Sequence, residues 1–213
     1  MFTGLIKEIC MVKSAYTAGG GMRLTVDLGK LADESKIGDS IAINGVCLTI
    51  AQMQGSLADF EVSSETLTKS TLGKLKSSSP VNTELAIKAD DRFGGHFVLG
   101  HVDGVATIKA ISRQGQFADI KFTATPELLA QMVIKGSVAV NGISLTIANM
   151  DEGSFSVAVI PETQKTTTLG TAKIGDTVNI ETDILIKTVR KQLEKILPQK
   201  QSLTTEKLKE LGF

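Results

Sequence analysis

The sequence has few cysteines and no excess of charge, and both shortages restrict what the protein can be. Two cysteines, Cys10 and Cys47, are too few for a disulfide framework. Lys plus Arg and Asp plus Glu both number 23, so the basic surface typical of nucleic-acid-binding proteins is not expected. No apolar run reaches the ~20 residues of a membrane-spanning helix, and the start lacks the pattern of a signal peptide. We therefore expect a cytoplasmic globular protein that binds neither nucleic acid nor membranes.

Motifs that would bind nucleotides or metals are also missing. Neither a GxGxxG motif that opens a helix nor a P-loop occurs, so no dinucleotide or nucleoside triphosphate site is indicated. The two histidines, His96 and His101, have no cysteine nearby and a poor spacing for zinc, so we expect no metal site. Both lie in residues 94–104, GGHFVLGHVDG, where glycines allow tight turns or close approach to a ligand. The alternative to a functional segment is a strand with a bend at each end.

The chain contains an internal duplication. Residues 37–51, IGDSIAINGVCLTIA, match residues 134–148, IKGSVAVNGISLTIA, at nine of fifteen positions, with an offset of 97. The same offset relates Glu84 to Glu181. With a shift of one residue, the first nine residues align with residues 97–105. The chain is therefore expected to consist of two halves with the same fold.

Each half contains a hairpin with two different faces. Asn-Gly pairs at 44–45 and 141–142 stand between alternating residues, a strong signal for a two-residue turn. The apolar faces consist of Ile41, Ile43, Val46, Leu48 and Ile50 and of Val138, Val140, Ile143, Leu145 and Ile147. The opposite faces consist of Ser40, Ala42, Cys47 and Thr49 and of Lys135, Ser137, Ala139, Ser144 and Thr146. Small, hydroxyl-bearing side chains suit a flat ligand lying against the strands, and a solvated surface is the alternative.

Short strands between turn signals favour a Greek-key barrel or a sandwich in each half. The tail differs, because apolar residues recur there at helical spacing and Pro198 ends the pattern. These residues are Ile186, Val189, Leu193, Ile196 and Leu197. The apolar stripe of this predicted helix either packs on the barrels of its own chain or associates with helices of other subunits. Shorter helical patterns cover residues 67–75, 127–132 and 205–211.

Several motifs, taken together and in order, resemble riboflavin synthase. They are MFTGLI at the start, NGVCLTIA and NGISLTIA in the hairpins, GGHFVLGHVDG, and IPETQKTTTLG at 160–170. The resemblance covers essentially the whole chain and implies an all-β fold of two homologous six-stranded Greek-key β-barrels plus a C-terminal α-helix. The implied domains are an N-terminal barrel at 1–96, a C-terminal barrel at 97–185 and a helical tail at 186–213.

The resemblance also implies a reaction and a partner. Each barrel would bind one molecule of 6,7-dimethyl-8-ribityllumazine, and a four-carbon unit would pass between the two, giving riboflavin and 5-amino-6-ribitylamino-uracil. The enzyme would be a transferase without an organic cofactor or metal. Three chains would associate through their C-terminal helices, and each active site would lie between the N-terminal barrel of one chain and the C-terminal barrel of its neighbour. Association of the trimer with lumazine synthase is left open.

By the same resemblance, Cys47, His101, Ser144 and Thr146 surround the reacting ring carbons, where His101 or Ser144 delivers a nucleophile or moves a proton. One lumazine would contact Gly4, Leu5, Ile6, Cys47, Leu48, Thr49, Glu61, Val62, Ser63, Ser64, Glu65 and Thr66, with Phe2 and Thr3 closing over it. The other would contact Gly100, His101, Val102, Lys135, Ser144, Leu145, Thr146, Ala158, Val159, Ile160, Pro161, Glu162 and Thr163. Ser40 and Asn141 complete the expected contacts, and His96 is assigned a structural role.

A non-catalytic lumazine or flavin carrier is the main alternative. Fluorescent lumazine-carrying proteins share the duplicated barrel, but they typically bind ligand in one half and have an eroded second half. In this chain both hairpins are intact, and His101 and Ser144 are present, so the enzyme is favoured. The similar barrel of flavin reductases needs an Arg-x-Tyr-[Ser/Thr] stretch, which the surroundings of Tyr16 do not supply.

Overall fold

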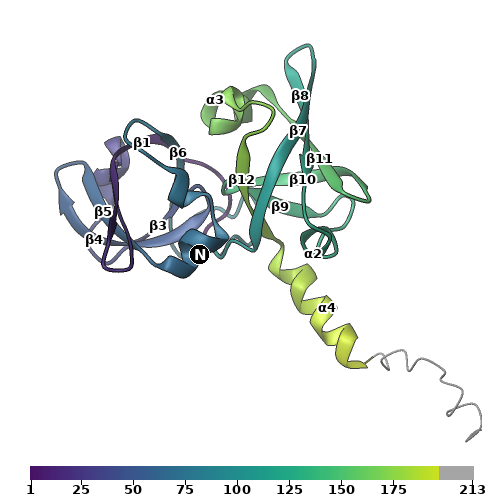
Figure 1. Cartoon of the computed structure of the whole chain (residues 1–213), viewed down its shortest axis with the longest axis horizontal. Coiled ribbons are helices and arrows are strands. Elements are labelled where there is room, and N and C mark those ends of the chain that lie inside the picture. Colours follow the sequence, from purple (N-terminus) through teal and green to yellow (C-terminus); the bar gives the residue numbers. More distant parts are fainter. Residues whose placement is uncertain (197–213) are drawn as a thin grey trace, which may run out of the picture.

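Residues 1–196, which the computed structural model describes, form two closed antiparallel barrels and a C-terminal helix (Figure 1). The first barrel consists of β1 (Glu8–Ala18), β2 (Gly21–Asp27), β3 (Ser40–Ile43), β4 (Val46–Gln54), β5 (Leu57–Val62) and β6 (Pro80–Leu85). The second consists of β7 (Gly104–Gln114), β8 (Phe117–Thr123), β9 (Ser137–Val140), β10 (Ile143–Asp151), β11 (Ser154–Val159) and β12 (Thr177–Thr182). Both barrels have the same cyclic strand order. The expected all-β fold of two homologous six-stranded barrels is confirmed.

Short helices connect the strands at equivalent places. They are η1 (Gly29–Glu34), α1 (Ser64–Lys69), η2 (Leu72–Lys74), α2 (Pro126–Leu129), α3 (Pro161–Thr166) and η3 (Thr168–Thr171). The helical pattern predicted over 67–75 is thus split between α1 and η2, and the one predicted over 127–132 is the single turn α2. The boundary expected at 96/97 falls in the segment that links β6 to β7.

The hairpins have the predicted register. Ala42 lies opposite Cys47 and Ala139 lies opposite Ser144, and each Asn-Gly pair forms the turn with positive φ at both residues. All ten residues of the two apolar faces are buried in the barrel cores. Because strand side chains alternate between faces, this register turns the small side chains away from the cores.

The faces of small side chains are partly buried between the two barrels, contrary to the expectation of an open ligand surface. Ala42 and Ala139 form a small apolar cluster with Phe2 and Val98, and all four are buried. The side chain of Phe2, which the resemblance places over a bound ligand, is fully buried in this cluster. Small residues are needed at these positions because the two barrels approach each other closely.

Two opening segments, residues 1–7 and 98–103, pass from one barrel to the other before β1 and β7 begin. Phe2 and Val98 pair with each other as an isolated antiparallel bridge. Beyond this bridge, the N–H of Ser144 in β10 donates to the carbonyl of Gly4 at 2.8 Å, and the N–H of Cys47 in β4 donates to the carbonyl of Gly100 at 3.0 Å. Each opening segment therefore lies against the hairpin of the opposite barrel.

Buried carboxylates hold both opening segments in place. Glu84 of β6 accepts hydrogen bonds from the N–H and the hydroxyl of Thr3, at 2.7 and 2.8 Å, and from the N–H of Gly4 at 3.0 Å. Glu181 of β12 accepts hydrogen bonds from the N–H groups of residues 99 and 100, at 2.7 and 2.9 Å. Burial raises the pKa of both carboxyls, and it raises that of Glu181 to about 7.

Two asparagines join the barrels reciprocally. The Asn179 side chain donates to the carbonyl of Asn44 at 2.8 Å and accepts from the N–H of Thr71 at 2.7 Å. The Asn82 side chain, in the other barrel, donates to the carbonyl of Asn141 at 3.0 Å and accepts from the N–H of residue 168 at 2.8 Å. The Asn44 and Thr71 groups are buried and the Asn141 and Thr168 groups are partly buried, so each bond satisfies a backbone group that has little access to water.

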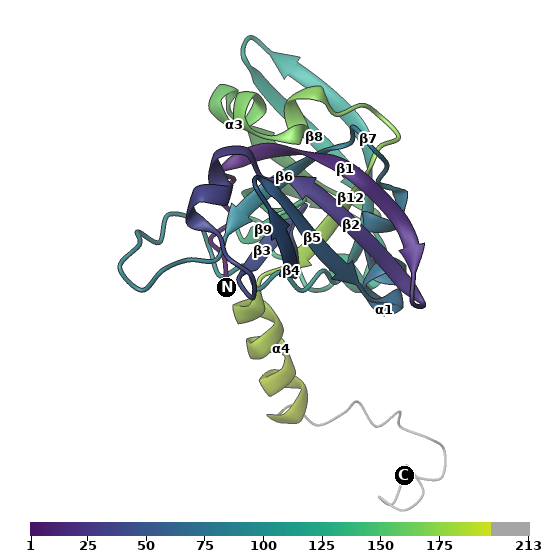
Figure 2. The same ribbon diagram turned by 90° about the vertical axis from the view of Figure 1, so that its left-hand side faces the viewer.

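The described part of the tail is the predicted helix, α4 (Ile184–Ile196), and it projects away from both barrels (Figures 1 and 2). Four of its apolar residues, Leu185, Val189, Leu193 and Ile196, are exposed to between 48% and 74%, whereas Ile184 and Ile186 are half-buried. Polar groups make its contacts with the second barrel: Lys187 Nζ lies 2.8 Å from Asp103 Oδ2, and Arg190 donates to the carbonyl of Ala130 at 2.8 Å. From Val189 to Ile196, the apolar stripe therefore does not pack on the chain's own barrels.

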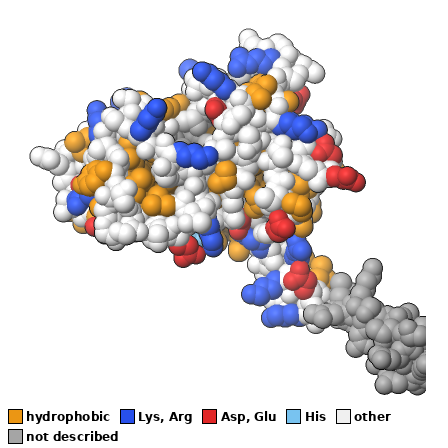
Figure 3. Space-filling model, in the orientation of Figure 1, with side chains coloured by type: hydrophobic (Ala, Val, Ile, Leu, Met, Phe, Trp, Pro, Cys, Tyr) orange, Lys and Arg blue, Asp and Glu red, His pale blue; other side chains and the backbone are white. Residues whose placement is uncertain are grey.

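The short helix predicted over residues 205–211 lies outside the described residues. Within residues 1–196, every helix is too short or too polar to cross a membrane. Basic and acidic side chains are interspersed on the face shown in Figure 3, in keeping with the balanced composition.

The reciprocal asparagines give a first test. We expect Asn179→Ala to lower the free energy of unfolding by about 2–4 kcal/mol, because the buried carbonyl of Asn44 and the N–H of Thr71 lose their partner. Denaturant unfolding monitored by circular dichroism measures the change. Asn149→Ala, at an exposed asparagine of the same barrel, serves as the control and should cost less than about 0.5 kcal/mol. Equal losses in the two variants would contradict the role given to Asn179.

The raised pKa of Glu181 predicts a dependence of stability on pH. An acid whose pKa is higher in the folded than in the unfolded state destabilises the fold once the unfolded chain ionises, so the free energy of unfolding should fall from pH 5 to pH 7. The contribution of Glu181 is at most about 3 kcal/mol. In Glu181→Gln this slope should become shallower, whereas Glu152→Gln, at an exposed glutamate, should keep the wild-type slope. An unchanged slope in Glu181→Gln would refute the prediction.

Candidate functional site

The first candidate site surrounds Cys47, near the start of β4. Its thiol is half-buried, and its backbone is bonded to Gly100 of the second opening segment. Gly100 has φ of +81°, and a Cβ there would lie 2.4 Å from the Cβ of Cys47. Only glycine fits this contact, because both the backbone conformation and the spacing exclude a side chain. His101 follows directly, with its side chain exposed.

The second candidate site surrounds Ser144, near the start of β10, with the same geometry. Gly4 of the first opening segment has φ of +79°, and a Cβ there would lie 2.6 Å from the Cβ of Ser144. Leu5 follows in the position that His101 occupies at the other site, and its side chain is also exposed. The two sites therefore repeat one backbone arrangement with different side chains.

The grouping of site residues expected from the sequence is wrong in one respect. The opening segments were assigned to the barrels that follow them, but each contacts the other barrel. Val102 packs against the core of the first barrel, beside Cys47, and Ile6 packs against the core of the second, beside Ser144. Residues 4–6 therefore belong with the Ser144 site, and residues 100–102 belong with the Cys47 site.

Several expected contact residues cannot offer their side chains to a ligand. Four of them point into the barrel cores and can contribute only backbone groups: Leu48, Val62, Leu145 and Val159. The Asn141 side-chain oxygen accepts the N–H of Asn179 at 2.8 Å within the second barrel, and the Asn141 carbonyl accepts from Asn82 of the first, so these two oxygens are engaged in contacts of the chain itself. The Thr3 hydroxyl is likewise bound to Glu84.

Other expected residues remain accessible around each hairpin. Their side chains are exposed or half-buried, and they are Ser40, Thr49, Lys135, Thr146, Ala158, Ile160, Pro161, Glu162 and Thr163. Thr49 and Thr146 occupy equivalent strand positions, so each site has an exposed hydroxyl two residues beyond Cys47 or Ser144. Lys135 has φ of +66° where the first half has a glycine, Gly38, with φ of +91°.

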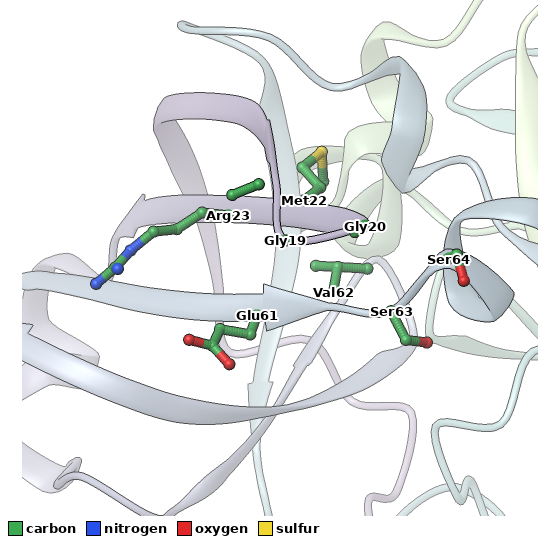
Figure 4. Close-up of a pocket in the computed structure, with 10 residues that line it drawn as sticks. Gly19, Gly20, Met22, Arg23, Glu61, Val62, Ser63 and Ser64 are labelled. Atoms are coloured by element: carbon green, nitrogen blue, oxygen red, sulfur yellow. The ribbon is translucent and has the colours of Figure 1, made fainter.

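A cavity of ≈ 550 Å³ lies beside the end of β5 (Figure 4). Glu61, Val62, Ser63 and Ser64 line one side, as expected for contact residues, and residues 18–23 of the turn between β1 and β2 line the other. Figure 4 shows the Ser63 and Ser64 hydroxyls at one end and the charged groups of Arg23 and Glu61 at the other. Sequence reasoning missed the turn, although three consecutive glycines at 19–21 mark it.

The equivalent helices α1 and α3 begin differently. Ser63 caps α1, since its hydroxyl accepts the N–H of Thr66 at 3.2 Å. In the second barrel Ile160 takes this position, no side chain caps α3, and Pro161 begins the helix instead. Glu65, in the first turn of α1, pairs with Lys69 at 3.2 Å on the surface.

His96 was expected to be structural, and the structure brings it to the second site. Its Nδ1 lies 2.7 Å from the hydroxyl oxygen of Ser144, and its backbone N–H donates to the carbonyl of Thr3 at 3.1 Å. Among the described residues its Nε2 has no hydrogen-bond partner, although it is buried. Burial lowers the pKa of this imidazole, so it is neutral near pH 7.

Comparisons with known proteins agree with this arrangement. The model of the lumazine binding domain matches the chain twice, at residues 3–86 and 99–183. The riboflavin synthases of Actinobacillus pleuropneumoniae and Bacillus subtilis are 40% and 39% identical to it, each over 100% of both chains. Crystal structures of LumP with riboflavin and with 6,7-dimethyl-8-(1'-D-ribityl) lumazine superpose with TM-scores of 0.80 and 0.78, at 22% identity, over 85% of this chain and 99% of that one. The match over the full length and in both repeats shows that the chain belongs to the riboflavin synthase family, with two lumazine-binding domains.

Proposed function

We propose that this protein is a cytoplasmic riboflavin synthase that binds two molecules of 6,7-dimethyl-8-ribityllumazine. It transfers a four-carbon unit from one to the other, which gives riboflavin and 5-amino-6-ribitylamino-uracil. The observation that carries this proposal is the repeated backbone arrangement at Cys47 and Ser144. Two equivalent sites suit a reaction in which both reactants are the same molecule.

Each site offers the groups that a ribityllumazine needs. β4 pairs with β5 only from Ile50 onward, and β10 pairs with β11 only from Ile147 onward. We assign the backbone groups of the strand segments before these residues to the uracil-like edge of the ring system. The exposed hydroxyls of Thr49 and Thr146 suit the ribityl chain. The opening segments supply the opposite walls, which only glycine allows to lie so close to the strands.

The two sites must treat identical molecules differently, because one lumazine donates carbon atoms and the other accepts them. Side chains at equivalent positions differ in the required way: Cys47 corresponds to Ser144, His101 to Leu5, and the cap Ser63 to Ile160. We assign Cys47, His101, Ser144 and the hydroxyl of Thr146 to the groups that contact the reacting rings. Much of the rate acceleration then comes from holding the two rings in a reactive arrangement.

A trimer would bring the two kinds of site together. The exposed apolar face of α4 supports this proposal, since such a stripe is stable only when another apolar surface covers it. Further apolar side chains are exposed around the Ser144 site, where they are available to the first barrel of a neighbouring subunit; they are Met1, Leu5, Phe93 and Phe97. An active site between subunits would need this contact.

Product formation distinguishes the enzyme from a lumazine carrier. When the purified protein is mixed with 6,7-dimethyl-8-ribityllumazine, we expect riboflavin to appear, with two lumazines consumed for each riboflavin formed. Absorbance and chromatography measure both. Binding of lumazine without any riboflavin would favour the carrier and refute the proposed enzyme.

Gly100 provides a matched test of the site in the same assay. Gly100→Ala should lower the turnover about 100-fold, because a Cβ would displace the segment from Cys47 and a shift of ~1 Å can cost this much. Gly55→Ala is the control: Gly55 also has positive φ, +60°, but a Cβ there meets no neighbouring atom. Turnover should therefore be nearly unchanged in the control, and a similar loss in both would show that backbone strain alone is responsible.

Charge on the apolar face of α4 tests the proposed trimer. Val189→Glu combined with Leu193→Glu should leave a folded monomer with strongly reduced turnover, since both side chains are already exposed within one chain. Thr188→Glu combined with Lys195→Gln changes the net charge equally on another face of the helix, and it should keep both the trimer and its activity. Light scattering after size exclusion gives the mass. A trimer in the first variant would contradict the proposal.

A further inference from the structure

The Ser144 site contains a hydrogen-bonded pair that the Cys47 site lacks. His96 Nδ1 lies 2.7 Å from Ser144 Oγ, which is within the range of a good hydrogen bond. No side-chain hydrogen bond to the Cys47 thiol is present in residues 1–196. The equivalent side chains of the two barrels, Cys47 and Ser144, therefore differ in their hydrogen bonding as well as in their chemistry.

His96 is held in place independently of Ser144. The backbone N–H of His96 donates to the carbonyl of Thr3, and the same opening segment is bound by Glu84 through the N–H groups of Thr3 and Gly4. His96 as a whole is 7% exposed, so its ring has little freedom to turn. A ring fixed in this way can fix the hydroxyl to which it is bonded.

The surroundings of the ring determine which group donates in this pair. An imidazolium would carry an N–H at Nε2, where the described residues offer no acceptor and the atom is buried. An unpaired buried donor of a charged group is costly, so the ring stays neutral. The same cost favours the neutral tautomer with its proton on Nδ1, because Nδ1 has a partner in the Ser144 hydroxyl. In this tautomer Nε2 carries only a lone pair.

In this tautomer Nδ1–H donates to Ser144 Oγ, and the serine proton is left to donate elsewhere. We propose that His96 is a positioning residue that fixes the Ser144 hydroxyl as a hydrogen-bond donor toward an oxygen or nitrogen acceptor of the pteridine bound in the second barrel. This inference rests on the proposed function. It makes the second barrel the one with a fixed donor, whereas among residues 1–196 no side-chain hydrogen bond fixes the Cys47 thiol of the first barrel.

Substitutions at position 96 separate a positioning role from a proton-transfer role. Asn carries an N–H donor at nearly the place of Nδ1 but does not titrate, whereas Leu has no donor. We expect His96→Asn to keep most of the turnover, with the shape of the pH profile of kcat from pH 5 to 8 unchanged. We expect His96→Leu to lower turnover about tenfold, the usual cost of one lost hydrogen bond. Equal turnover in wild type and His96→Leu would overturn the proposal, and so would a changed pH profile in His96→Asn.

A double-mutant cycle with Ser144→Ala tests whether His96 acts through the serine. The loss in His96→Leu/Ser144→Ala should be no larger than in Ser144→Ala alone, because the serine hydroxyl is already absent. If the losses of turnover in the two single variants multiply in the double variant, the proposal is overturned. If thermal unfolding shows that His96→Leu does not fold, His96→Gln replaces it. The side chain of Gln is one methylene group longer than that of Asn, so its amide cannot bond Ser144 in the same way. Turnover in His96→Gln equal to that in His96→Asn would then be the contradicting result.

Affinity for lumazine, measured by fluorescence titration, separates this inference from the proposed function. If the wild-type protein forms no riboflavin, the proposed function fails. The dependence of the His96 effect on Ser144 can still be measured as a change in the affinity for lumazine. His96→Leu and Ser144→Ala should then weaken lumazine binding at the second barrel equally, and the double variant should bind no more weakly than either single variant. His96→Asn should bind like wild type. Independent effects on affinity would overturn the positioning role by itself.

Discussion

The crossing of the two opening segments is the constraint on which both candidate sites depend. Each segment leaves the bridge between Phe2 and Val98 and lies against the hairpin of the opposite barrel, where glycine permits contact with Cys47 or Ser144. Carboxylates at the ends of β6 and β12 bind the segments through backbone N–H groups. The residues around each candidate site therefore come from both halves of the chain.

The two barrels repeat the same backbone structure, but side chains at the two candidate sites differ. The backbone repeats closely, because strand order, turns, segment contacts and interbarrel asparagines all recur. The side chains that we propose to face a ligand differ at Cys47 and Ser144, and the buried His96 is hydrogen-bonded to Ser144. A repeated backbone with unlike side chains is what a reaction between two identical molecules in unlike roles requires.

Local patterns predicted much of the fold, and contacts between distant segments were harder to predict. Asn-Gly turns and strict alternation fix the hairpin registers, so the sequence predicted the pairing of Ala42 with Cys47. The repeat itself concealed the crossing, since each opening segment fits either of two nearly identical hairpins. The bond between His96 and Ser144 joins residues 48 positions apart and follows no periodic pattern, so only the structure could reveal it.

The reciprocal asparagines also bear on how such a chain arose. Asn82 reaches across to the backbone of Asn141, and Asn179 reaches across to the backbone of Asn44, so the same bonds are made twice with the roles exchanged. This is the isologous pattern of a two-fold dimer. Two copies of a single ancestral barrel could have formed every one of these bonds before their genes were fused, and fusion then allowed each half to mutate separately.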